Sequence, residues 1–231
     1  MKFHIITLFE EACDAYLSTS IIGRARKEKK ISVTYQNPRD FVDNKWGKVD
    51  ERPYGGGPGM VMSALPIVKA VEKALKSLVA KPPRDKSRRG VVIWFSPSAK
   101  QFTNKDADAL IKKYDEVILV CGRYEGIDER AKKILKDTRL PAGRQAPIKE
   151  FAVGEAVYTG GEVPALAIVD AVTRRLPGVL GKDASVEERR IASSAVYTRP
   201  ETITYKKKNY RVPKVLQTGH HANIDKWRSK R

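Results

Sequence analysis

The sequence predicts an α/β protein built around a largely parallel sheet, and two observations support this class. Short apolar runs rich in β-branched residues, at 2–9, 90–97 and 116–126, have the character of buried strands that end in turn residues. Segments with helical spacing of apolar residues, at 10–30, 63–80 and 104–114, separate these strands. Strands that alternate with helices are typical of parallel sheets covered by helices.

The N-terminal half follows this alternation element by element. The strand at 2–9 leads into one long helix at 10–30 that ends in a basic turn, and a short strand at 31–36 runs into a turn at 37–40. The helix at 63–80 has Ser63 as its cap and Pro66 in its first turns, where proline is tolerated. In such sheets, ligands bind at the carboxyl ends of the strands, which here are 96–97 and 121–123.

The second half is less regular. Residues 137–151 lack apolar periodicity and carry Pro141, Gly143 and Pro147, so we expect a surface loop there. A glycine-rich turn then leads into a strongly apolar helix that starts near Glu162, with Pro164 in its first turn. The polar stretch 182–196 is weakly patterned, and we place an interdomain linker there, between a domain at 1–181 and a small C-terminal domain at 197–231.

The charge of the chain points to a partner rich in phosphate. The 231 residues carry a formal charge of +18, and residues 197–231 alone hold ten Lys or Arg and two acidic residues, interleaved with Tyr and Trp. This clustering favours an RNA or DNA contact over a charged surface that serves solubility alone. No apolar run is long enough for a membrane span and no signal peptide is evident, so we expect a cytosolic protein with no membrane partner.

Several common kinds of site are excluded by the motifs. The stretch 52–60, RPYGGGPGM, lacks the Gly-Lys-Ser/Thr ending of a nucleotide P-loop, and no GxGxxG follows a strand. Cys13 and Cys121 lie far apart without a CxxC or a paired histidine, so we expect reduced, buried thiols and no metal site. Three glycine-containing turns at strand ends remain, at 95–100, 121–126 and 152–164.

The wording and order of several blocks resemble one family. These blocks are PRDF (38–41), VDERPYGGGPGM (49–60), ILVCGRYEGIDER (118–130), VGEAVYTGGEVPA (153–165), RRLPGVLG (174–181), YTRP (197–200), and VPKVLQTGHH followed by KWR. In this order, over nearly the whole chain, they resemble the bacterial tRNA (guanine-N1-)-methyltransferases of the TrmD family, in the SPOUT class. The resemblance implies a SPOUT-type domain with a deep trefoil knot and a small, mostly helical C-terminal domain.

The resemblance also implies that the three turns hold S-adenosylmethionine. The cofactor-binding residues would be Phe95, Ser96 and Pro97 on the first turn, Gly122 and Glu125 on the second, and Val153, Gly154, Glu155, Ala156, Val157, Tyr158, Gly160, Gly161 and Pro164 on the third. Glycine suits such a site because it lets backbone groups approach a ligand closely. Members of this family are homodimers with sites built from both subunits. The apolar helix at 165–172 is a candidate for that interface, or for a helix buried within one subunit.

The implied reaction is methyl transfer to N1 of guanosine 37 of tRNA. Guanine N1 carries a proton, so a carboxylate base is needed, and charge then develops toward O6, where a cation would stabilise it. Arg174 matches the arginine that the family uses for O6, although it could instead cap its helix. The linker that supplies the family's aspartate base is shorter here. If the alignment gap falls before Glu187, Glu188 takes the position of the aspartate, and if it falls after Glu187, Arg189 does. We expect Glu188 to be the base, with Glu187 as the next candidate.

Substrate RNA would be contacted by residues from two parts of the chain. Those in the N-terminal half are Arg52 and Tyr54, and those in the basic tail are Tyr197, Arg199 and His220. Family enzymes are associated with Mg²⁺, although no carboxylate cluster dedicated to a metal is evident. Two other readings remain open: an RNA-binding protein of the same scaffold that has lost the base, and a SPOUT methyltransferase that acts on a different RNA, such as ribosomal RNA. Glu125, Arg174 and the three turns disfavour the first, and VDERPYGGGPGM together with YTRP disfavours the second.

Overall fold

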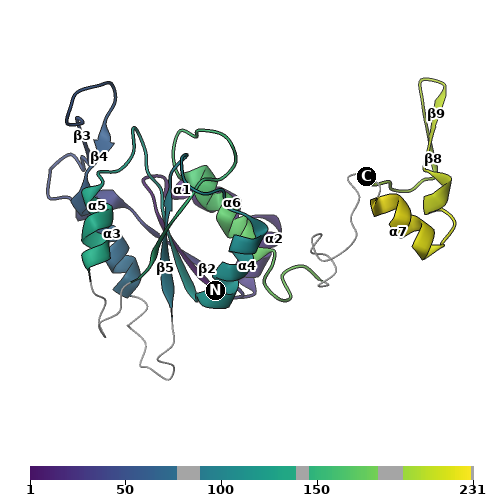
Figure 1. Ribbon diagram of the computed structural model, residues 1–231, viewed down its shortest axis with the longest axis horizontal. Coiled ribbons are helices and arrows are strands. Elements are labelled where there is room, and N and C mark those ends of the chain that lie inside the picture. The colour runs from purple at the N-terminus through teal and green to yellow at the C-terminus, as the bar shows by residue number, and fades with distance from the viewer. Residues whose placement is uncertain (77–88, 139–145, 182–194, 230–231) are drawn as a thin grey trace. The chain divides into compact units, whose positions relative to one another are not determined.

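The computed structural model describes residues 1–76, 89–138, 146–181 and 195–229 (Figure 1). Two compact units make up the chain, Met1–Val179 and Leu180–Arg231, called here the N-terminal and the C-terminal unit. The predicted linker at 182–196 lies almost entirely outside the described residues. Within the described ranges, no helix is both long enough and apolar enough to cross a membrane.

A five-stranded parallel sheet forms the centre of the N-terminal unit. Its order is β2-β1-β6-β5-β7, and every neighbouring pair is parallel, which confirms the predicted α/β class. The strands are β1 (Lys2–Ile6), β2 (Ser32–Gln36), β5 (Gly90–Phe95), β6 (Glu116–Val120) and β7 (Ile148–Phe151). Because all five strands run the same way, the loops that follow β5, β6 and β7 emerge at one edge of the sheet.

Helices cover both faces of this sheet (Figure 1). Alternate residues of β6 point to opposite faces, so Val117 and Leu119 belong to one hydrophobic cluster and Ile118 and Val120 to the other. The first cluster is closed by α1 (Glu10–Leu17), α2 (Ser20–Lys27), α4 (Asn104–Lys113) and α6 (Glu162–Thr173), and the second by α3 (Ala64–Lys76) and α5 (Arg130–Asp137). Burial on both faces explains why these strands are continuous apolar runs.

Two local expectations were wrong, one turn was confirmed, and one helix was not predicted. The single helix expected at 10–30 is two helices, because Ser20 adopts a left-handed φ of 50° and the Thr19 hydroxyl bonds to the carbonyl of Tyr16. The turn at 37–40 is confirmed: the N–H of Asp40 donates to the carbonyl of Asn37 at 3.0 Å, and the turn opens a short 3₁₀ helix, η1 (Pro38–Phe41). Helix α5 was not predicted. The loop expected at 137–151 contains β7 at its end, although its middle, 139–145, lies outside the described residues.

The glycine-rich stretch 52–60 connects a short antiparallel pair, β3 (Asp50–Glu51) and β4 (Val61–Met62). Gly55, Gly56, Gly57 and Gly59 all have positive φ, a conformation that other residues adopt only with strain. The stretch is therefore a turn whose backbone requires glycine. Its neighbour β4 is tied to the turn after β6, since the Met62 N–H donates to the carbonyl of Gly126 at 2.9 Å.

The described part of the C-terminal unit contains a hairpin beside its helices, which the expectation of a mostly helical domain did not include. It consists of a hairpin, β8 (Thr202–Tyr205) and β9 (Lys208–Arg211), followed by η4 (Lys214–Leu216) and α7 (His221–Ser229). Ile224 of α7 is buried, and the rings of Tyr197 and Trp227 lie 6.3 Å apart. The hairpin was missed because its two-residue turn, Lys206-Lys207, lacks the Asn-Gly signal of such turns.

Candidate functional site

The loops that follow β5, β6 and β7 are hydrogen-bonded to one another. The N–H of Ser96 donates to the carbonyl of Phe151 at 3.1 Å, and the N–H of Phe102 donates to that of Ala152 at 2.8 Å. The N–H of Gly161 donates to the carbonyl of Gly122 at 2.9 Å. The third loop thus contacts both the first and the second, and the three turns singled out by the sequence form one structure.

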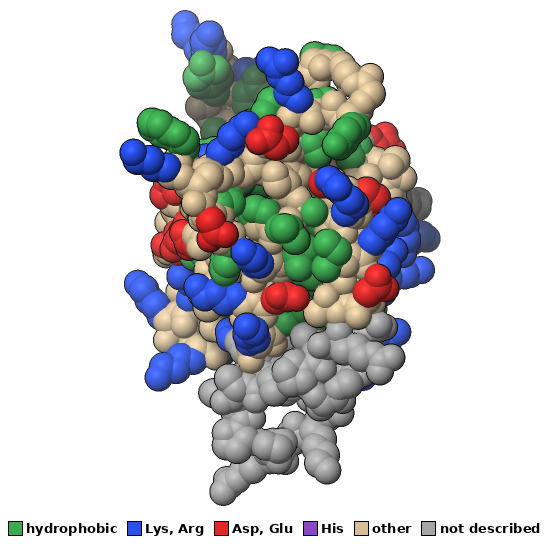
Figure 2. All heavy atoms as spheres, turned by 90° about the vertical axis from the view of Figure 1, so that its left-hand side faces the viewer, with side chains coloured by type: hydrophobic (Ala, Val, Ile, Leu, Met, Phe, Trp, Pro, Cys, Tyr) green, Lys and Arg blue, Asp and Glu red, His purple; other side chains and the backbone are tan. Residues whose placement is uncertain are grey.

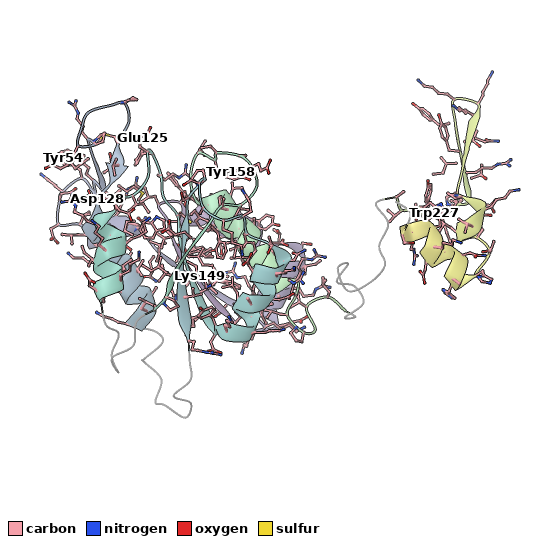
Figure 3. The ribbon with its side chains drawn as sticks, viewed as in Figure 1. Tyr54, Glu125, Asp128, Lys149, Tyr158 and Trp227 are labelled. Carbon is pink, nitrogen blue, oxygen red and sulfur yellow. The ribbon has the colours of Figure 1, made fainter. Side chains whose placement is uncertain are left out.

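A pocket of about 260 Å³ lies between these loops. Figure 3 shows Glu125 and Tyr158, from two of the loops, on the same edge of the sheet. The lining residues are Phe95, Ser96, Pro97, Gly122, Arg123, Tyr124, Glu125, Gly126, Phe151, Ala152, Val153, Ala156, Val157, Tyr158, Thr159, Gly160, Gly161 and Pro164. The lining combines apolar side chains with backbone amides and one carboxylate.

The structure brings together all of the predicted cofactor residues except Gly154 and Glu155. A Cβ added to Gly154 would lie 3.1 Å from the hydroxyl of Tyr158, so this glycine makes room for a lining side chain. The lining residues that were not predicted from the sequence are Arg123, Tyr124, Gly126, Phe151, Ala152 and Thr159. Arg123 and Tyr124 lie between Gly122 and Glu125 in the sequence, so their position in the same turn was the available signal.

Two adjacent glycines let the second and third loops cross in contact. A Cβ on Gly161 would lie 2.6 Å from the Cα of Cys121 and 3.0 Å from the amide nitrogen of Gly122. A Cβ on Gly160 would lie 2.5 Å from Nε of Arg123 and 2.6 Å from Oε2 of Glu162. Since backbone atoms cannot move aside as a flexible side chain can, any side chain at Gly161 would separate the loops.

A buried carboxylate holds this crossing together. Glu162, at the start of α6, accepts a hydrogen bond from the Thr7 hydroxyl at 2.8 Å through Oε1, and its Oε2 lies 3.0 Å from Nε of Arg123. The Arg123 guanidinium lies 4.4 Å from the ring centroid of Phe9 and donates to the carbonyl of Thr159. Arg123 also lines the pocket, so this ion pair connects the end of β1, the second loop and the third loop.

Two thiols lie close to this carboxylate. Burial, and then the charge of Glu162, raise the pKa of Cys13 from 9.0 to about 11, and the same two causes raise the pKa of the fully buried Cys121 well above its ordinary value. Both cysteines are free in the structure, as the sequence predicted. Neutral, buried thiols are poor nucleophiles and metal ligands, so neither is a candidate catalytic group.

A second and larger pocket, of about 1540 Å³, adjoins the first through Glu125, which lines both. Arg52 and Tyr54, the predicted RNA contacts from the glycine-rich stretch, line this second pocket, and the Tyr54 side chain is 99% exposed. Gly59 of the same stretch approaches Glu125 so closely that a Cβ would lie 2.6 Å from Oε1. Figure 2 shows this side of the N-terminal unit, with hydrophobic side chains exposed at its centre and charged ones around them.

The remaining predicted residues lie elsewhere. Arg174 is the C-cap residue of α6, and it lines neither of the two pockets described above. Glu187 and Glu188 lie outside the described residues. Tyr197, Arg199 and His220 belong to the C-terminal unit, where His220 is exposed next to the first turn of α7. Among the residues that the structure describes, no three His, Cys, Asp or Glu side chains are grouped to hold a metal ion.

Comparison with known proteins assigns the family. The model of the family described as tRNA (Guanine-1)-methyltransferase TrmD matches residues 1–231. Curated relatives include the tRNA (guanine-N(1)-)-methyltransferases of Buchnera aphidicola (38% identical over 99% of this chain and 88% of the relative), Lachnospira eligens (40%, over 99% and 88%) and Shewanella sediminis (39%, over 99% and 86%). The chain therefore belongs to the TrmD family of tRNA (guanine-1)-methyltransferases.

Proposed function

We propose that this protein transfers a methyl group from S-adenosylmethionine to N1 of guanosine 37 of tRNA. The observation that carries the proposal is the pocket between the three loops, because it is a concave, mostly apolar site at the carboxyl edge of a parallel sheet, where such sheets bind ligands. Family membership supplies the reaction class. The protein would act in the cytoplasm, where its RNA substrate resides.

The pocket residues suit this methyl donor. Phe95, Pro97 and Val153 offer apolar surface for an adenine ring, and backbone groups beside Gly122 and Gly160 can hydrogen-bond its edge. The carboxylate of Glu125 would attract the positive charge of the sulfonium. When bound, the donor supplies an electrophilic methyl group. The interleaved loops also support our proposal that the chain forms a trefoil knot here.

The base and the cation would come from outside this pocket. Arg174 follows the C-terminal end of α6, whose first turn lines the pocket at Pro164, so the ten-residue separation spans about 15 Å along the helix. We therefore propose that Arg174 serves the pocket of a second subunit, where it stabilises charge on guanine O6. Glu188, with Glu187 as the alternative, would remove the N1 proton from the linker.

Complementation between subunits tests this arrangement. A chain carrying Arg174→Ala and a chain carrying Gly161→Val should each be inactive alone, and a mixture refolded together should regain activity, because one of its two sites is intact in the heterodimer. Activity that stays absent in the mixture, although mixed dimers are detected, would contradict the proposal.

The RNA would enter from the second pocket. Because Glu125 lines both pockets, a guanine held beside Arg52 and Tyr54 would have access to the methyl donor. The dense positive charge of residues 197–231 would add contacts to the phosphate backbone of the same tRNA.

The decisive experiment is methylation with labelled S-adenosylmethionine of tRNA transcripts that carry G or A at position 37. We expect 1-methylguanosine on the first transcript alone. Equal labelling of both would indicate another target position, and label on neither, with intact RNA binding, would indicate a non-catalytic RNA-binding protein.

The base is assigned by two matched variants. Glu188→Gln should abolish single-turnover methylation and leave the affinity for S-adenosylmethionine unchanged, whereas Glu187→Gln should retain activity. The reverse pattern would assign the base to Glu187, and full activity of both variants would exclude a glutamate base in the linker.

A further inference from the structure

The hairpin β8–β9 of the C-terminal unit is exposed on both faces. Ile203, Tyr205 and Tyr210 are 52%, 61% and 52% exposed, and every residue from 203 to 211 is exposed. Within this unit, the hairpin projects away from α7 (Figure 1). A two-stranded ribbon without a covered face is marginally stable in water, so its apolar side chains would gain from a partner.

The side chains of the hairpin are sorted by chemistry between its two faces. Ile203 is paired with Tyr210, and Tyr205 with Lys208, so these four side chains share one face because paired residues and alternate residues point the same way. The opposite face carries Thr202, Thr204, Asn209 and Arg211. We call the first of these, Ile203, Tyr205, Lys208 and Tyr210, the aromatic face.

Cations flank both tyrosines of the aromatic face. Nζ of Lys206 lies 5.5 Å from the ring centroid of Tyr205, and Nζ of Lys208 lies 5.5 Å from that of Tyr210. Rings for stacking, next to ammonium groups for phosphates, are the combination with which proteins bind unpaired nucleotides.

The turn of the hairpin is also unusual. Lys206 and Lys207 have φ of 49° and 60°, the left-handed region that a two-residue turn of this kind needs and that Asn-Gly fills most readily. Lysine is therefore an unfavourable residue for the backbone at both positions, although the two lysines concentrate positive charge at the tip of the hairpin. A disfavoured local choice of this sort is expected where function requires the side chains.

We propose that the aromatic face binds unpaired bases of the substrate RNA by stacking on Tyr205 and Tyr210, while Lys206 and Lys207 contact the adjoining phosphates. The proposal rests on the proposed function, since tRNA is the RNA concerned. It goes further by naming the element of the protein that binds the single-stranded segments of this tRNA. A second protein copy on the same face is the competing occupant, which three consecutive lysines disfavour by charge repulsion.

The first test separates charge from folding. Lys206→Asn with Lys207→Gly installs the preferred turn, so the hairpin should fold at least as well while tRNA binding weakens. The salt dependence should show this directly. The slope of the logarithm of the tRNA association constant against the logarithm of salt concentration should become shallower by about 1.4, because each phosphate contact to a single strand contributes roughly 0.7. Lys112→Ala with Lys113→Ala on α4 removes two adjacent exposed lysines as a matched control and should leave the slope unchanged.

The second test addresses stacking. Tyr205→Ala and Tyr210→Ala should each weaken binding of a tRNA transcript by about fivefold or more, with the salt slope unchanged, and barely affect binding of a fully paired RNA duplex of equal length. Tyr205→Phe should bind like the wild type, because the ring is kept. Thr204→Val, on the opposite face, is the control.

Several results would overturn the proposal: wild-type affinity in both alanine variants, equal losses on transcript and duplex, or an altered oligomeric state with unchanged RNA binding. The proposed function is checked separately by formation of 1-methylguanosine with the wild type at saturating tRNA. If the wild type methylates tRNA and the hairpin variants keep its KM, only the hairpin inference fails. If the wild type makes no product, the proposed function fails whatever the hairpin variants bind.

Discussion

The loop crossing beside the smaller pocket and the hairpin β8–β9 meet opposite physical demands. At the crossing, Gly161 lies against backbone, and Glu162 is 5% exposed, with Oε1 accepting a hydrogen bond from Thr7 and Oε2 in an ion pair with Arg123. In the hairpin, the tyrosines and lysines are exposed and lie against one another. A small ligand is bound well by a surface that is already in place, whereas a long polyanion is bound through charge and adaptable stacking. We therefore expect substitutions at the crossing to lower the free energy of unfolding and the affinity for S-adenosylmethionine strongly, and similar substitutions in the C-terminal unit to lower them little.

The largest effect is expected at Gly161. Gly161→Ala places a Cβ 2.6 Å from the Cα of Cys121, and neither backbone can yield without separating the loops. We expect the free energy of unfolding to fall by about 1–3 kcal/mol and the affinity for S-adenosylmethionine to fall about tenfold or more, measured by chemical denaturation and by calorimetry. Gly181→Ala is the matched control, since a Cβ there meets nothing within 4 Å. Equal behaviour of the two variants would refute the rigid crossing.

A smaller effect is expected from the ion pair. Glu162→Gln should lower the free energy of unfolding by roughly 1–3 kcal/mol, less than for a fully buried pair because the Arg123 side chain is 25% exposed. It should also raise the KM for S-adenosylmethionine more than it lowers kcat. Combining it with Arg123→Met should cost less than the sum of the two single changes.

The exposed pair between Arg228 and Asp225 of α7 serves as the comparison for the ion pair. Asp225→Asn should change stability by under about 1 kcal/mol. Additive effects of Glu162→Gln and Arg123→Met would contradict coupling between the two loops.

The smallest effect concerns the thiols. The pKa of Cys13 is about 11 in the folded protein and 9.0 for an ordinary exposed thiol. The stability that comes from keeping this thiol protonated is therefore fully present below pH 9 and is lost as the pH rises through 11. Native protein at pH 8 should therefore react with a thiol reagent far more slowly than unfolded protein, and the rate should increase toward pH 11. Fast labelling of either cysteine at pH 8 would show that the region around Glu162 opens readily.

The sequence predicted the strands β1, β2, β5 and β6 of the sheet and missed β7, for physical reasons. Strands buried on both faces, such as β5 and β6, are continuous apolar runs and are easily recognised in the sequence. The edge strand β7, Ile-Lys-Glu-Phe, is largely polar and follows a stretch rich in proline and glycine, so it resembled a loop. Helix α5 begins only four residues after the glycine-containing turn at 121–126 and was not predicted.

The candidate site was predicted through family resemblance rather than through pattern. Periodicity places the three turns at strand ends, but it cannot show that they touch, because contacts such as that of Gly161 with Gly122 join residues far apart in the sequence. The partnership of Glu162 with Thr7 and Arg123 was likewise invisible, since it joins three separate elements. The Lys206-Lys207 turn departs from the residues expected in such a turn, so no local rule would have predicted it.

The most direct test asks whether the loop crossing binds the cofactor and the hairpin binds the tRNA, by titrating two variants with each of the two ligands. Binding of S-adenosylmethionine and of tRNA should be measured separately for Gly161→Ala and for the pair Lys206→Asn with Lys207→Gly. We expect the first variant to lose affinity for the cofactor and keep its affinity for tRNA, and the second variant to do the reverse. Loss of both ligands by both variants, or loss of cofactor by the hairpin variant alone, would contradict it.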